Sequence, residues 1–139
     1  MANNVLAAKR EKGKLHVSIR ARALCTYTLH IVSNANVFQR GVDDDLIFDI
    51  KNQAKGIFRK IWRANRQRLD IPKEAERRQR LQSEALEMCE DLEDNIQIAK
   101  PLFHLSRKRI GHWGGMIEEV SELTKAWAAS DRKRNKADM

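Results

Sequence analysis

Residues that bend or cross-link a chain are scarce in this sequence. Its 139 residues include six glycines, two prolines and two cysteines. So few turn-forming residues argue against a fold built from many short strands and tight turns. Cys25 and Cys89 each lie within an apolar helical pattern, so we expect two buried thiols in a reducing compartment. A bridge between neighbouring helices remains an alternative.

Signatures of catalysis are also missing. The sequence has no glycine-rich phosphate loop, no nucleophile elbow and no H-E-x-x-H motif, and its four histidines are dispersed. We therefore predict no catalytic residue, no metal site, no cofactor and no small-molecule substrate, and we expect that the protein is not an enzyme. No apolar run approaches the ~20 residues that span a bilayer, and no signal-peptide core is evident. We expect a cytoplasmic protein without a membrane partner.

Helical periodicity is what the sequence has in abundance. Apolar residues recur at three or four positions in four segments, which predicts an all-α, antiparallel up-down four-helix bundle over residues 16–130. A basic segment is expected at 1–15, either a flexible arm or the frayed start of a helix, and a basic tail at 131–139. The helices are expected from about 16 to 34, 43 to 68, 70 to 100, and from 110 through Trp127.

Local signals refine the ends of these helices. Asp43 or Asp44 is expected to cap the second helix, and Asp70 the third, with Pro72 in its first turn. Pro101 is expected to end or kink the third helix at about Lys100. The glycines near the start of the fourth helix should permit close helix contact or a bend; they are Gly111, Gly114 and Gly115.

Positive charge concentrates in the segment 51–80, which has eleven Lys or Arg against three Asp or Glu. Like charges at i, i+4 on a helix repel by ~0.2–0.5 kcal/mol per pair, so a one-sign stripe favours a polyanionic partner over a merely solvated face. In an up-down bundle the basic segments of all four helices meet at one pole, and most acidic residues at the other. The net charge of +8 agrees with a nucleic-acid partner.

We select candidate nucleic-acid-binding residues by charge clustering alone. They are Arg20, Arg22, Lys51, Lys55, Arg59, Lys60, Arg63, Arg66, Arg68, Lys73, Arg77, Arg78, Arg80, Arg132, Lys133 and Arg134. No base-reading motif accompanies them, so backbone contact and shape recognition are expected. Trp62, Trp113 and Trp127 are expected to pack in the core or at a subunit interface, and base stacking by Trp62 is the alternative.

Three segments carry a family resemblance: RARALCTYTLHIVSNANVFQR (20–40), QAKGIFRKIWRAN (53–65) and WGGMIEEVSELTKAWAASD (113–131). They resemble the accessory variability determinants of diversity-generating retroelements, which are four-helix-bundle proteins related to those encoded in ribosomal-RNA intervening sequences. The likeness covers about residues 17–135 and includes no catalytic signature.

The resemblance implies a homopentameric barrel of bundles that binds the retroelement's reverse transcriptase. With that enzyme it would engage the template RNA, and possibly the cDNA, during adenine-directed mutagenesis and mutagenic retrohoming. Two alternatives stay open: a stand-alone nucleic-acid-binding bundle of the intervening-sequence type, and a protein–protein adaptor whose oppositely charged poles drive head-to-tail assembly.

Overall fold

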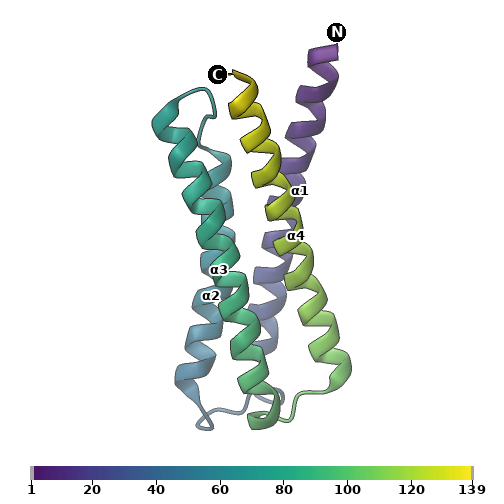
Figure 1. The fold of residues 1–139 in the computed structure, drawn as a ribbon. Helices are drawn as coiled ribbons and strands as arrows, with labels where there is room; N and C mark the ends of the chain where they lie inside the picture. Colours follow the sequence, from purple (N-terminus) through teal and green to yellow (C-terminus); the bar gives the residue numbers. More distant parts are fainter. Residues whose placement is uncertain (1, 139) are drawn as a thin grey trace.

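Four long helices make up the structure, a computed structural model that describes the backbone of residues 2–138 and the side chains of residues 16–135. The helices are α1 (Ala2–Ser33), α2 (Asp44–Asn65), α3 (Pro72–Leu102) and α4 (Arg107–Asp138). Residues 2–138 contain no strand, so the prediction of an all-α four-helix bundle is confirmed (Figure 1). None of these helices combines the length and the apolar character that crossing a membrane would need, as judged over the described residues.

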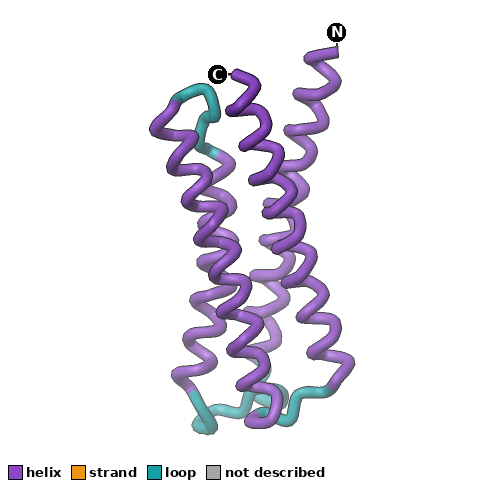
Figure 2. Tube along the Cα trace, viewed as in Figure 1, coloured by secondary structure: helices purple, strands orange, loops and turns teal. Residues whose placement is uncertain are grey.

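Each helix packs against two others, in the order α1–α2–α3–α4 and back to α1, while the diagonal pairs make no such contact among the residues that the structure describes. Both termini and the link between α2 and α3 lie at one end of the molecule (Figure 1). The other two links lie together at the opposite end (Figure 2). Because the helices pack in this cyclic order, the α1–α2 side of the bundle is opposite the α3–α4 side.

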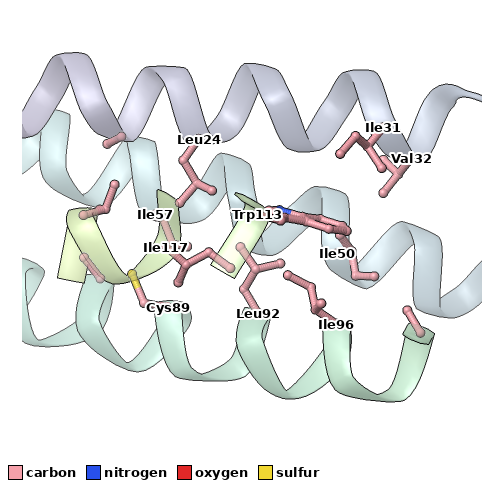
Figure 3. Packing of buried hydrophobic residues seen from close by; sticks show 14 of the residues in the cluster. Leu24, Ile31, Val32, Ile50, Ile57, Cys89, Leu92, Ile96, Trp113 and Ile117 are labelled. Carbon is pink, nitrogen blue, oxygen red and sulfur yellow. The ribbon is translucent and has the colours of Figure 1, made fainter. Parts of the chain in front are cut away.

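The core is a continuous apolar column along the bundle axis. Buried residues on every helix recur at three or four positions, which keeps them on the inward face of an α-helix. Figure 3 shows Leu24, Ile31, Val32, Ile50, Ile57, Cys89, Leu92, Ile96, Trp113 and Ile117 meeting there. The Trp113 indole is fully buried, and its Nε1 donates a hydrogen bond of 3.0 Å to Oγ1 of Thr28, so the one polar atom of that ring is satisfied.

Of the two predicted N-caps, the one at the start of α2 is confirmed and the one at the start of α3 is wrong. Asp43 caps α2, because its Oδ1 accepts a 3.0 Å hydrogen bond from the Leu46 amide, as predicted. At α3 the N-cap residue is Ile71, which has no side-chain cap bond. The expectation that Asp70 caps this helix is wrong, because its carboxylate binds Arg68 instead.

Three helices extend further than predicted, whereas α2 ends at Asn65, before the expected end at about Arg68. α3 continues through Pro101 and ends at Leu102, two residues beyond the expected end at about Lys100. Proline in the last turn removes only one backbone hydrogen bond, and no further turn follows that a kink would displace. α1 begins at Ala2 and α4 ends at Asp138, so the expected arm 1–15 and tail 131–139 carry helical backbone from 2 to 15 and from 131 to 138. The side chains of 1–15 and 136–139 lie outside the described residues.

Close helix contact occurs at a different glycine from the ones expected. A Cβ added at Gly111, Gly114 or Gly115 would meet nothing within 4 Å, so these residues do not mark a tight contact within the chain. At Gly56 in α2, an added Cβ would overlap Cε of Met88, a side chain of α3. The close approach therefore lies between α2 and α3, and sequence reasoning missed it.

We expect Gly115→Ala to stabilise the protein. Gly115 is exposed within α4 and has free space around its Cα, while alanine exceeds glycine in helix propensity by about 1 kcal/mol. Urea unfolding should show an increase of about 0.5–1 kcal/mol in the free energy of unfolding. Gly41→Ala is the matched control: Gly41 has a φ of 88°, a conformation unfavourable for alanine, and should lower stability. A loss of stability in Gly115→Ala would contradict the open environment described above.

Candidate nucleic-acid interface

Five of the sixteen candidate cations are held by carboxylates. The pairs are Arg20–Glu119 at 2.5 Å, Lys60–Glu84 at 2.6 Å, Arg68–Asp70 at 2.6 Å, and Arg78 and Arg134 with Asp131 at 2.7 and 2.8 Å. The hydrogen bond from Arg68 holds the pKa of Asp70 below its usual value, and that from Lys60 lowers the pKa of Glu84. These five cations contribute less to the attraction of a polyanion because a neighbouring negative charge offsets them.

Arg78 is the one candidate whose place in the structure contradicts a surface role. Its side chain is 1% exposed, so it cannot reach a bound nucleic acid. The guanidinium donates from Nε to Oδ2 of Asp131 at 2.7 Å and from Nη2 to Oδ1 at 2.8 Å. This two-bond geometry matches the planar fork of arginine to a carboxylate. We therefore remove Arg78 from the candidate interface.

The Arg78–Asp131 pair belongs to a buried polar network. Gln82 donates to Oδ2 of Asp131 at 2.8 Å, and Nη2 of Arg134 donates to Oδ1 at 2.8 Å. Nη1 of Arg78 donates to the carbonyl of Gln67 at 3.2 Å. The Arg78 guanidinium also lies 5.0 Å from the ring centroid of Trp127. The network thus joins α3, α4 and the α2–α3 link at the end of the bundle that carries the termini.

Eleven candidate cations remain without an ion pair among the described side chains, and they form two groups. The basic end consists of Arg63, Arg66, Lys73, Arg77, Arg80, Arg132 and Lys133, all of them exposed. The basic flank consists of Arg22, Lys51, Lys55 and Arg59, which lie on α1 and α2 below that end. Only the basic end lies where the sequence predicts a basic pole.

The basic end is assembled by three helices. The last turn of α2 and the link after it carry Arg63 and Arg66, the first turns of α3 carry Lys73, Arg77 and Arg80, and the late part of α4 carries the remaining two. These segments lie at the same end of the molecule (Figure 1). The cations at 9–14 and Lys136, also expected there, lie outside the described side chains.

The basic flank shows that positive charge is not confined to one pole. Arg20 pairs with Glu119 near the middle of α4, and Arg22 lies beside Phe58 and Trp62 in the last turns of α2. No Asp or Glu occurs in the segments 16–42 and 50–69. Lys55 and Arg59 lie close enough to Cys25 to oppose the rise in its thiol pKa that burial causes. The α1–α2 side therefore carries cations with no acid of its own between them.

The cysteines agree in part with the expectation of two buried thiols. Cys89 is buried and Cys25 is half-buried, and both are free thiols rather than a bridge. Burial raises the pKa of Cys89 to about 12, and the nearby carboxylates of Glu93 and Glu90 act in the same direction. Neither thiol is activated as a nucleophile.

The three tryptophans divide into two environments. Trp113 and Trp127 are 0% and 7% exposed, as expected for core residues, whereas Trp62 is 40% exposed. Core packing of Trp62 is therefore wrong, and the alternatives of a subunit interface and of base stacking stay predictions. Ile61 and Ala64 occupy the inward face of α2, which leaves Trp62 at the outer border with α1.

Acidic side chains gather on the opposite side of the bundle. A groove between α3 and α4 is lined by Glu93, Asp94 and Glu118, together with the open glycines of α4. Partial burial raises the pKa of Glu93, and the neighbouring Glu118 and Asp94 raise it further. Within the described residues no group of three or more His, Cys, Asp or Glu has the arrangement of a metal site.

The arrangement as a whole favours the binding of an anionic polymer. When exposed guanidinium and ammonium groups neutralise phosphates, the counterions condensed on the nucleic acid are released, which favours binding. The described helices carry these groups without an element that reads bases in a groove, so contacts to the phosphate backbone are favoured. Comparison with protein-family models, with curated proteins and with solved structures finds no match. The family resemblance therefore depends on the quoted sequence segments alone.

Proposed function

We propose that this chain is a non-enzymatic accessory protein of a diversity-generating retroelement. It binds the reverse transcriptase and its template RNA through basic surfaces, and it supports mutagenic cDNA synthesis in the cytoplasm. The proposal includes the antiparallel up-down connectivity and the homopentameric barrel that the sequence resemblance implies. It assigns the chemistry of polymerisation to the reverse transcriptase and the binding of RNA to the bundle.

The basic end is the observation that carries this proposal. Seven exposed cations from three helices converge there, and none has an ion pair among the described side chains. Such a cluster repels itself in the free protein, and the repulsion is relieved when phosphates replace bulk counterions. Its contacts are to the RNA backbone, so affinity should fall steeply with salt and depend little on sequence.

Genomic context and reconstitution test the proposed function. We expect a reverse-transcriptase reading frame beside this gene, and its product is the enzyme to reconstitute with the bundle. We expect the two proteins to copurify, and we expect cDNA synthesis on the retroelement's own template RNA to require the bundle. A reverse transcriptase that makes the same products without the bundle would overturn the proposal. Sedimentation of the bundle at micromolar concentration provides a second check, because a monomer would contradict the pentameric assembly.

A protein–protein adaptor is the second candidate, and the acidic α3–α4 groove is the observation that favours it. That groove lies opposite the basic flank, so one copy could present an acidic surface to the cations of the next. The adaptor predicts that neutralising exposed cations changes the sedimentation coefficient. The accessory function predicts that neutralising the basic end changes RNA affinity while the oligomer persists.

A further inference from the structure

A stacked aromatic pair lies on the α1–α2 side of the bundle, within the basic flank: Trp62 is exposed, and Phe58 is half-buried against the core. The rings of Phe58 and Trp62, one helical turn apart on α2, are stacked with centroids 5.7 Å apart and an interplanar angle of 28°. Arg22 of α1 places its guanidinium carbon 5.7 Å from the Phe58 centroid and 5.8 Å from the Trp62 centroid. Phe58 thus supports the indole from within the helix, and α1 supplies a planar cation beside it.

The setting of this pair is strongly positive. Arg22 has no carboxylate partner among the described side chains. Lys55 and Arg59 on α2, and Arg66 at its C-cap, follow the helical spacing of Trp62. Because the segments 16–42 and 50–69 contain no acid, nothing within them offsets these charges. An apolar partner would gain nothing from the cations, whereas a partner with both planar rings and phosphates uses the ring pair and the charges together.

We propose that Trp62, backed by Phe58 and Arg22, stacks on an unpaired base of single-stranded RNA while Lys55, Arg59 and Arg66 contact the adjoining phosphates. From Lys55 to Arg66 the helix rises about 16 Å, the length of about five stacked nucleotides. Stacking on an aromatic ring accepts any base, which agrees with the lack of base-reading groups. Bases within a duplex are already stacked on each other, so the site selects single strands. This inference rests on the proposed function and assigns it a recognition site.

The test compares three proteins on two RNAs. Trp62→Leu removes the aromatic ring but keeps an apolar contact with Phe58, and Trp62→Phe keeps a ring. The RNAs are a 20-nucleotide strand without self-complementarity and the same strand annealed to its complement. We expect Trp62→Leu to bind the single strand roughly 5- to 150-fold more weakly than the native protein, with duplex affinity unchanged, and Trp62→Phe to recover most of the loss.

Tryptophan fluorescence gives a readout that a purely structural role for Trp62 would not produce. The exposed indole of Trp62 should be quenched as the single strand is added. In Trp62→Phe the remaining Trp113 and Trp127, which are buried, should show no such quenching. Thermal unfolding of each variant establishes that the bundle is intact before its RNA affinity is compared.

The other outcomes overturn the inference in distinguishable ways. If Trp62→Leu binds both RNAs as the native protein does, while loss of charge at the basic end weakens both, then stacking is wrong and the proposed function stands. If Trp62→Leu instead dissociates an oligomer and leaves RNA affinity unchanged, the aromatic pair is an interface between copies or with another protein. If the native protein binds neither RNA at low salt, the inference and the proposed function fail together.

Discussion

Replacing Asp131 by alanine should destabilise the bundle more than any change to an exposed charge. The substitution leaves the Arg78 guanidinium, which is 1% exposed, without a counter-charge, and it removes the acceptor of Gln82 and Arg134. An uncompensated buried charge costs about 3–5 kcal/mol, which for a protein of this length lowers Tm by about 10–17 °C. Thermal or urea unfolding followed by circular dichroism measures the loss.

Two further variants decide whether the cause is the buried charge. Arg78→Met combined with Asp131→Leu and Gln82→Leu removes the three buried polar side chains and leaves Arg134, which is partly exposed. It should recover most of the stability, because apolar groups of similar size replace a buried ion pair at little cost. Asp70→Ala breaks the Arg68–Asp70 pair, whose partners are both exposed, and should leave Tm essentially unchanged. A native-like Tm for Asp131→Ala would show that the network contributes little.

Neutralising three cations of the basic end should reduce both the affinity for RNA and its dependence on salt. The variant combines Arg63→Gln, Arg66→Gln and Arg77→Gln, all exposed and without an ion pair among the described side chains. Each lost phosphate contact on a single strand lowers the slope of log affinity against log salt by about 0.7, so the slope should fall in magnitude by about 2. At low salt the affinity should fall by about tenfold or more.

A control with the same change in net charge separates local contact from overall attraction. Lys100→Gln, Arg107→Gln and Lys108→Gln remove three exposed cations at the opposite end of the bundle. We expect this variant to bind with a slope close to that of the native protein. Equal losses in the two variants would mean that total charge drives binding, and the basic end would lose its assigned role.

Much of the fold could be predicted because it depends on apolar periodicity. The spacing of core residues predicts four helices, and the Asp43 cap of α2 follows from local chemistry. The end of α3 and the contacts between helices were less predictable, since they depend on which side chains of the neighbouring helices pack there. Gly56 illustrates this: its role is set by Met88 on another helix, and the sequence around it contains no trace of that contact.

The candidate site was predicted less completely, and Arg78 shows why. Charge clustering assigned it to the surface, yet position 78 continues the inward stripe of Leu81, Ala85 and Leu92 along α3. Asp131 likewise lies one turn beyond the buried Trp127 on α4. A basic residue and an acidic residue that both occupy core positions near helix ends indicate a buried ion pair. Helical periodicity was therefore the signal in the sequence that could have identified the pair.

Trp62 shows the opposite error. Its apolar character predicts burial, but its direction on α2 places it beside α1 rather than towards the bundle axis, and Ile61 takes the inward position. Which neighbour borders each flank of a helix depends on the packing order of the four helices. That order emerges only from the assembled structure.

The salt dependence of RNA binding by the unaltered protein tests the central claim most directly. The measurement is the affinity for a single-stranded RNA at several salt concentrations from low to physiological. If each of the seven cations of the basic end contacts one phosphate, log affinity falls against log salt with a slope of about −5. A slope near zero, or no binding at low salt, would contradict the account.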